Sequence, residues 1–354
     1  MSDTTPKKAP FSMQIDPALF EPATAEEKKQ QEVMSESTTF LKDSMKKLMR
    51  NPLAVFSIVV LAFILIVIIV APLVVPYGYS EILKYNGMKD KTAMNLAPFQ
   101  YSANEQKYMA ENGVTLFPHI FGTDELSRDY FIRVVYGTRV SLAVGFFASL
   151  IVLVIGVLYG SISGYCGGRV DLIMMRIVDV IYSLPDMLVI ILLSVVLKEL
   201  LDGSKGIIAR LGTNMVSIFI VFGMLYWVGM ARLVRGQILS VKENEYVLAA
   251  KSIGTSSPRI IRRHILPNCL SVIIITTALQ IPSAIFTESF LSFIGLGVAA
   301  PMPSLGSLAN AARQGMQSYP YKLMFPALMI CLIVLALNLL GDGLRDALDP
   351  KLRK

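Results

Sequence analysis

The chain has 354 residues, of which 54% are hydrophobic and 17% are charged, and its formal net charge is +7. A water-soluble domain of this length could hardly tolerate so apolar a composition, so the bilayer is the expected solvent. The Lys and Arg residues form short clusters between apolar runs, which argues against nucleic-acid binding. The cysteines have no CxxC spacing and the histidines form no cluster, so no disulfide framework or metal site is predicted.

Six apolar runs are candidates to cross about 30 Å of hydrocarbon, a distance that takes roughly 20 helical residues. Residues 1–44 precede them as a polar tail without the apolar core of a signal peptide, so the first run, within residues 45–76, is expected to remain as an anchor. The chain is therefore predicted to be an all-α, polytopic membrane protein with a five-helix core over residues 140–344. The predicted spans cover residues 52–75, 140–164, 177–197, 216–231, 270–286 and 323–340.

The distribution of basic residues predicts the orientation. If the N-terminus is cytoplasmic, the inner flanks hold 17 Lys and Arg residues and the short outer segments hold 5. Cytoplasmic flanks carry this excess, so the tail 1–44, the loop 232–268 and the C-terminal segment 345–354 are all predicted to be cytoplasmic. Residues 77–139 form a long outer loop of no assignable fold, in which Arg128, Arg133 and Arg139 are expected to belong to an interfacial helix.

Enzymatic motifs are missing from the sequence. No G-x-x-x-x-G-K-[ST] phosphate cradle occurs, so the chain is not expected to hydrolyse ATP by that mechanism. No Ser, His and Asp trio stands out either. An enzyme is therefore not predicted.

The basic loop has an internal order of its own between Glu245 and Asn268. A short helix with small residues at its centre is expected up to Gly254, which can adopt the left-handed conformation that ends a helix. A second, basic helix is expected to begin near Pro258 and to continue until Pro267 opens the fifth span. Such a surface can contact another protein or lipid phosphates, or it can be ordinary positive-inside charge.

Five motifs, in order, give the chain a recognisable pattern. Ala249-Ala250, Gly254 and Leu266-Pro267 resemble the EAA loop of permease subunits in ATP-binding-cassette importers, and the whole set is similar to the dipeptide, oligopeptide and nickel permease family, most of all to the oligopeptide "C" type subunit. Leu248 departs from the pattern where the family usually has Glu, Ser127 where it has Gly and Leu305 where it often has Trp. The other motifs are Gly122-Thr123-Asp124-Glu125-Leu126 with Arg128-Asp129, Arg133, Gly137 and Arg139-Val140-Ser141-Leu142; Gly164-Tyr165 with Gly167-Gly168, Asp171, Met175-Arg176, Asp179 and Pro185; Glu288 to Gly297; and Gly341 to Pro350.

The resemblance implies a type I importer permease fold in the bacterial cell membrane. It also implies a homologous permease partner, two cytoplasmic ATPase subunits that bind ATP and magnesium, an extracytoplasmic solute-binding protein and a peptide substrate, with no cofactor bound by this chain. Rocking of the spans would then give alternating access. The residues assigned to ATPase coupling are Glu245, Tyr246, Ala249, Ala250, Gly254, Arg259, Arg262, Arg263, His264 and Pro267.

Three acidic residues are candidates for the transport path or its gate, because acids within spans are costly. Asp179 and Asp186 are seven residues apart and would share one face of a continuous helix. The alternative for Asp179, which we prefer, is an ion-paired residue near Arg176 or a solvated one. Glu288 can face an outer vestibule, or it can simply solvate a helix end, which is the preferred interpretation.

Two other functions remain open at this point. Within the family, the cargo can be dipeptides or nickel, although no His or Cys is clearly placed along the path, which favours peptides. In another class, a stand-alone secondary transporter would need ion-coupling acids at the midplane of broken helices, and a basic docking loop would serve no purpose in it.

Overall fold

The computed structural model describes residues 40–85, 87–201, 203, 213–298 and 302–348. The chain divides into two units, Met1–Asp43 and Ser44–Lys354, and the second unit is a helical bundle. Most of the predicted tail 1–44 and the last six residues lie outside the described part of the chain.

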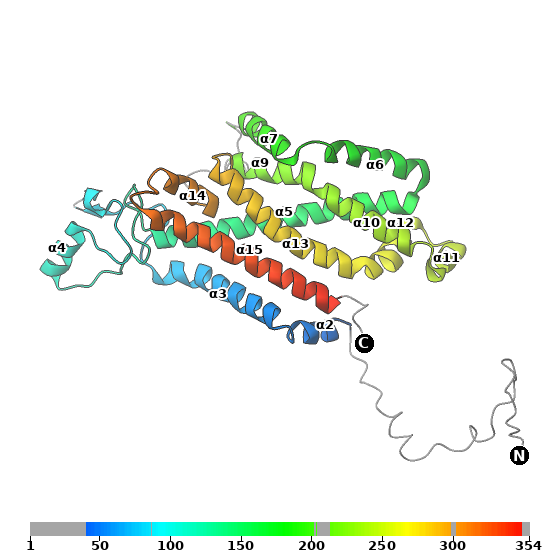
Figure 1. The fold of residues 1–354 in the computed structure, drawn as a ribbon, viewed down its shortest axis with the longest axis horizontal. Helices are drawn as coiled ribbons and strands as arrows, with labels where there is room; N and C mark the ends of the chain where they lie inside the picture. Colours follow the sequence, from blue (N-terminus) through cyan, green and yellow to red (C-terminus); the bar gives the residue numbers. More distant parts are fainter. Residues whose placement is uncertain (1–39, 86, 202, 204–212, 299–301, 349–354) are drawn as a thin grey trace, which may run out of the picture. The chain divides into compact units, whose positions relative to one another are not determined.

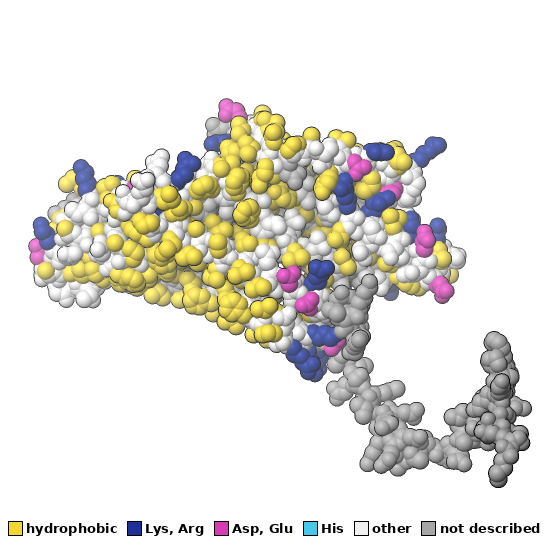
Figure 2. All heavy atoms as spheres, viewed as in Figure 1, with side chains coloured by type: hydrophobic (Ala, Val, Ile, Leu, Met, Phe, Trp, Pro, Cys, Tyr) yellow, Lys and Arg dark blue, Asp and Glu magenta, His cyan; other side chains and the backbone are white. Residues whose placement is uncertain are grey.

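Five helical runs in the described residues are long and apolar enough to cross a membrane, and a sixth span exists if two helices that meet at a bend are counted together. These findings confirm an all-α, polytopic membrane fold with up to six spans. Apolar side chains cover the middle of the bundle in Figure 2, whereas charged side chains gather toward its ends. The five runs are α3 (Pro52–Val74), α5 (Tyr130–Cys166), α9 to α10 (Thr213–Val241), α12 to α13 (Ser257–Phe293) and α15 (Pro320–Leu348).

The third span is broken. α6 (Gly168–Tyr182) and α7 (Asp186–Leu201) are bent by 88° relative to each other, and Pro185 lies at the break. Proline disfavours the helical conformation of the residue before it, so Leu184 cannot readily continue α6. The predicted third span over 177–197 is therefore a bent pair of helices, and Asp179 and Asp186 do not share the helix face that the sequence suggested. The side chain of Asp186 lies outside the described residues.

Two spans contain a π turn. η3 (Phe222–Tyr226) joins α9 (Thr213–Val221) to α10 (Trp227–Val241), and η4 (Ile261–Ile265) joins α12 (Ser257–Ile260) to α13 (Leu266–Phe293). Pro267 lies in the first turn of α13, as predicted for the start of the fifth span, but the helical path is continuous with the preceding basic helix from Ser257. The wider turn comes directly before Pro267, where the proline ring would otherwise crowd the preceding turn of an α-helix.

The second span begins earlier than predicted. Asp129 caps α5 by accepting a hydrogen bond from the Ile132 N–H at 2.9 Å, and the helix then continues to Cys166. Arg133 and Arg139 therefore belong to the first turns of α5, not to a separate interfacial helix.

Glycines allow α5 and α10 to pack closely. A Cβ atom added at Gly160 would lie 2.5 Å from the Ala231 carbonyl oxygen, and one added at Gly156 would lie 2.5 Å from the Met230 Cβ. Small residues let helix backbones approach in this way inside membranes. The resulting close packing holds the helix that leads into the basic loop.

Residues 77–129 fold into a small unit outside the spans, which we call the outer subdomain. A two-stranded antiparallel sheet pairs Lys84 with Lys89 and Tyr85 with Met88. Figure 1 shows α4 of this subdomain and α11 of the basic loop at opposite ends of the bundle. The remaining elements are α2 (Phe40–Leu48), β1 (Lys84–Tyr85), β2 (Met88–Lys89), η2 (Lys91–Ala93), α4 (Ala103–Asn112), α11 (Glu245–Ser252) and α14 (Leu305–Arg313).

Candidate functional site

The basic loop contains a short, well-terminated helix. α11 (Glu245–Ser252) follows α10 after three residues. Gly254 has a φ of +78° and its N–H donates to the Lys251 carbonyl at 3.0 Å, so the predicted helix stop at this glycine is confirmed. The Thr255 N–H then donates to the Ala250 carbonyl at 3.1 Å. These bonds fix the reversal of the chain between α11 and α12.

α11 has one face buried in its own protein and one face free. Val247 and Ala250 are buried in an apolar cluster that includes Ile260 and Ile265. Ala249 lies on the exposed side, and Ile253 beyond the helix end is 83% exposed. The two central alanines therefore have different environments, and only Ala249 is available for close contact with another molecule.

An exposed apolar and basic surface results at this end of the bundle, and we call it the α11 surface. Large apolar residues that stay in solvent together commonly mark a protein contact site. Among the described residues, the guanidinium groups of the three arginines of α12 and η4 have no ion-pair partner. His264 is half-buried, whereas Glu245 and Pro267 are exposed. The α11 surface consists of Glu245, Tyr246, Leu248, Ala249, Ile253, Arg259, Arg262 and Arg263.

Ion pairs connect α6 with α10, directly before the loop. Arg235 makes a bidentate contact with Asp171, with both nitrogen–oxygen distances 2.5 Å. Arg232 donates to Asp179 at 2.7 Å, and both of these side chains are partly exposed. Asp179 is thus ion-paired, although with Arg232 and not with its sequence neighbour Arg176. The Asp171 pair was missed from the sequence because its partners are 64 residues apart.

Glu288 is fully buried, so the preferred interpretation of a solvated helix end is wrong. The hydroxyls of Ser141 and Ser292 donate to its carboxylate, each at 2.7 Å. The same hydroxyls accept hydrogen bonds from the backbone N–H groups of Leu305 at 3.3 Å and Val298 at 3.0 Å. Glu288 therefore connects α5 and α13 to the start of α14, and it lines no open path in the described structure.

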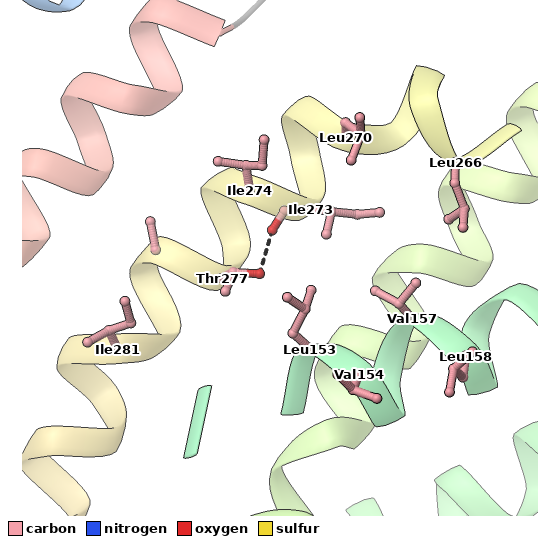
Figure 3. Close-up of a pocket in the computed structure, with 11 residues that line it drawn as sticks. Leu153, Val154, Val157, Leu158, Leu266, Leu270, Ile273, Ile274, Thr277 and Ile281 are labelled. Atoms are coloured by element: carbon pink, nitrogen blue, oxygen red, sulfur yellow. Dashed lines mark hydrogen bonds between the residues drawn. The ribbon is translucent and has the colours of Figure 1, made fainter. Parts of the chain in front are cut away.

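A groove of ≈ 610 Å³ lies between α5 and α13 (Figure 3). Its walls are aliphatic, with Leu153 and Leu158 on α5 facing Leu270 and Ile281 on α13. The one polar side chain of the lining, Thr277, donates to the Ile273 carbonyl within its own helix at 2.8 Å. The groove therefore offers shape and apolar contact, but no hydrogen-bonding group that would select a polar ligand.

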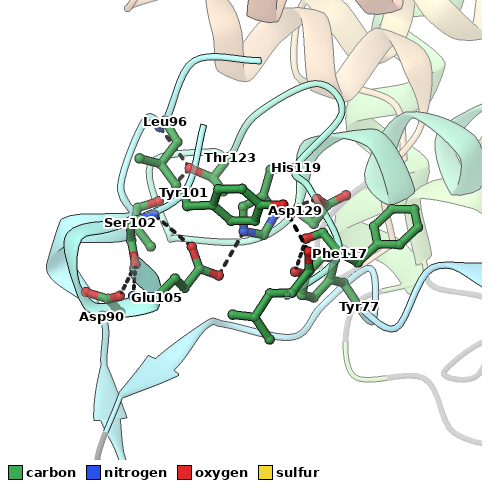
Figure 4. A network of polar contacts seen from close by, with 12 residues as sticks. Tyr77, Asp90, Leu96, Tyr101, Ser102, Glu105, Phe117, His119, Thr123 and Asp129 are labelled. Carbon is green, nitrogen blue, oxygen red and sulfur yellow. Dashed lines mark hydrogen bonds and ion pairs between the residues drawn. The ribbon is translucent and has the colours of Figure 1, made fainter. Parts of the chain in front are cut away.

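A buried polar network organises the outer subdomain (Figure 4). The His119 ring contacts Asp129 at 2.7 Å and Glu105 at 3.1 Å, and it stacks on Tyr77. Burial alone would lower the pKa of His119, but the two carboxylates outweigh it and raise this pKa to about 9. Burial likewise opposes ionisation of Glu105, yet its bonds to His119 and to the Ser102 backbone lower its pKa. No sequence pattern marks this network, because its members follow no fixed spacing.

Comparisons with known proteins show the family of the chain. The family model "Binding-protein-dependent transport system inner membrane component" matches residues 156–354, and "N-terminal TM domain of oligopeptide transport permease C" matches residues 39–108. The chain is 39% identical over 336 residues to the oligopeptide transport system permease protein OppC of Bacillus subtilis, covering 95% of this chain and 98% of that relative. It is 42% identical over 319 residues to the dipeptide transport system permease protein DppC of the same organism, covering 90% and 88%.

A solved structure of the MetNI methionine ABC transporter in an inward-facing conformation has a TM-score of 0.48 at 17% identity, covering 62% of this chain and 97% of that chain. The bundle and the sequence relatives together define a membrane-integral permease. The chain belongs to the family of inner-membrane components of binding-protein-dependent transport systems.

Proposed function

We propose that this permease forms, with a homologous subunit, the path through which an ATP-binding-cassette importer moves oligopeptides. Two ATPase subunits would bind ATP and magnesium in the cytoplasm, and a solute-binding protein would deliver the peptide from outside. The relative named as an oligopeptide permease, which matches almost the whole length of this chain, supports this substrate class. The 42% identity to a dipeptide permease makes dipeptides the second candidate.

The α11 surface is the proposed contact with an ATPase subunit, and the free side of α11 is the observation that carries this assignment. Val247 and Ala250 hold the helix against the bundle, while Leu248 and Ile253 remain exposed. The neighbouring arginines can pair with acidic groups of a partner. Leu248 stands where the resembling family usually has Glu, so the contact at this position would be apolar instead of charged.

Coupling would follow from how α11 is connected. α10 leads into it after three residues, and α12 leaves through a continuous helical path into α13. Movement of a partner that grips α11 would therefore be passed directly to two spans. This arrangement requires the loop 232–268 and both chain termini to be cytoplasmic, as the charge distribution predicts.

The test is an Ala-to-Arg substitution on the free face of α11 in the purified, reconstituted importer. We expect A249R to lower ATPase-subunit affinity at least tenfold and to abolish peptide-stimulated ATP hydrolysis, because a long charged side chain would prevent close contact. The matched control is A110R, on the exposed side of α4 in the outer subdomain, which should behave like the wild type. Normal coupling in A249R would contradict the assignment.

The substrate and the class of transporter need separate measurements. Competition between labelled tetrapeptide and unlabelled peptides of two to five residues would separate an oligopeptide importer from a dipeptide importer. Peptide uptake by this chain alone in liposomes, without any ATPase, would instead establish the stand-alone transporter.

A further inference from the structure

A pocket of ≈ 290 Å³ lies where the outer subdomain meets the starts of α5 and α15 and one side of α14. Its lining is unusually rich in charged groups, and aliphatic side chains of α14 form part of the wall. The residues that matter are Asp124, Glu125, Arg128, Arg133, Lys322 and Ala311.

The single buried carboxylate of the pocket is already engaged. Arg128 contacts Asp124 Oδ2 through Nε at 2.7 Å and through Nη2 at 2.6 Å. The Nε of Arg133 lies 3.5 Å from the same oxygen, which is too long for a hydrogen bond. This buried Nε has no hydrogen-bond partner within the described part of the chain.

Lys322 makes no ion pair among the described residues, although Glu125 and Asp124 interact with its charge from a greater distance. Its side chain is only 4% exposed, and its ammonium contacts the Asn95 side-chain oxygen and lies 4.6 Å from the centre of the Tyr319 ring. No carboxylate of a described residue lies within 4.0 Å of it. Glu125 also lines the pocket but is exposed to solvent. Three cations thus face one buried carboxylate.

We propose that this pocket binds a carboxylate group from another molecule, seated between Lys322 and Arg133. A buried ammonium without an ion-pair partner is costly. A carboxylate has two oxygens, so it can accept hydrogen bonds from an ammonium and a guanidinium at the same time. The small volume and the aliphatic wall at Ala311 fit a carboxylate on a short apolar stem. The free C-terminus of a short peptide and the acidic side chain of a docked protein both have this chemistry. The binding site itself does not depend on peptide import.

The first experiment supplies the carboxylate within the chain. Ala311 is exposed on the pocket wall, so A311E can place a carboxylate in the pocket, and A311Q is the matched neutral control. We expect A311E to melt at a higher temperature than A311Q in the purified complex, because the surplus positive charge is neutralised. A melting temperature of A311E equal to or below that of A311Q would overturn the proposal.

The second experiment measures binding and distinguishes the two sources. Tri-alanine, tri-alanine amide and the purified solute-binding protein are each titrated onto the complex. We expect K322M to weaken either tri-alanine or the solute-binding protein at least tenfold, K322R to retain binding, and K91M, at an exposed lysine of η2, to have no effect. Loss of tri-alanine binding, with the amide already weak, identifies a free carboxylate. Loss of the binding protein alone identifies an acidic side chain, and no change in either titration overturns the proposal.

Discussion

The two ends of the bundle treat their polar groups in opposite ways. In the outer subdomain, Asp90, Asp129 and His119 are all buried. The Asp90 carboxylate accepts a hydrogen bond from the Ser102 hydroxyl, and the Asp129 carboxylate is hydrogen-bonded to the His119 ring. At the other end, the arginines of α12 and η4 are exposed and Ile253 is almost fully in solvent. The polar groups of the His119 network are satisfied within the outer subdomain, whereas the arginines of the α11 surface have no ion-pair partner among the described residues.

Removing His119 should give the largest loss of stability. H119A leaves the carboxylates of Asp129 and Glu105 next to each other without a cation, and breaking a buried charge pair costs about 3–5 kcal/mol. Thermal denaturation of the purified protein would measure this, and proteolysis should locate the damage in residues 77–129. H264A, at the other end, should cost about 0.5 kcal/mol or less. Equal losses for the two variants would contradict the comparison.

Raising the pH should produce a loss of somewhat smaller size in the wild type. The pKa of His119 is about 9 in the folded protein and about 6.5 in an unfolded chain. Its contribution, about 3 kcal/mol, is therefore fully present below pH 6.5 and disappears as the pH rises through 9. Unfolding of wild type and H119A, followed from pH 6 to 10, should show convergence of the two stabilities at the alkaline end.

Thr123 offers a milder test of the same subdomain. Its buried hydroxyl donates to the Ala93 carbonyl at 2.5 Å and accepts from the partly buried Leu96 N–H at 2.9 Å. T123V keeps the shape but leaves these groups unsatisfied, at a cost of about 2 kcal/mol. T123S restores the hydroxyl and should recover most of that loss in the same denaturation assay.

At the α11 end, G254A should cost about 1 kcal/mol. Nothing lies within 4 Å of a Cβ added at Gly254, so the penalty comes only from its left-handed backbone. G236A is the control, because Gly236 also has free space but lies within α10, where alanine is preferred. If G236A lowered the free energy of unfolding as much as G254A, the cost would not come from the left-handed backbone of Gly254.

Neutralising the free arginines should have the smallest effect on stability. The double variant R262A/R263A is expected to change the free energy of unfolding by about 0.5 kcal/mol or less, because both side chains are exposed. Binding of the ATPase subunit should weaken nevertheless, and surface plasmon resonance at low and high salt would show whether the loss is electrostatic. A large loss of stability in this variant would show that the arginines stabilise the fold and would contradict their assignment to a contact surface.

The sequence predicted what depends on local chemistry. Runs of apolar residues located the spans, and Gly254 correctly marked the end of α11. The sequence could not show that Ala249 is exposed and Ala250 is buried. This difference depends on how α11 packs against residues that are distant in the sequence, such as Ile238.

Long-range pairing explains the remaining differences. The carboxylate of Glu288 is satisfied by Ser141, 147 residues away, and no local pattern reveals that bond. Pro185 was visible in the sequence, but whether a proline kinks a span or breaks it depends on the neighbouring helices. The candidate coupling loop was thus located from sequence, while its free and buried faces were not.

The π turn at Ile261–Ile265 also sets a rotational phase. It accommodates one residue more than an α-helical turn would, and one residue corresponds to about 100° of rotation around a helix axis. Deleting a single residue from this turn would therefore restore an ordinary α-helical turn and leave α11 and Arg259 facing nearly the same direction. The same deletion in the regular part of α13 would instead rotate them by about 100° relative to the rest of the span, although the chemical character of every remaining side chain would be unchanged.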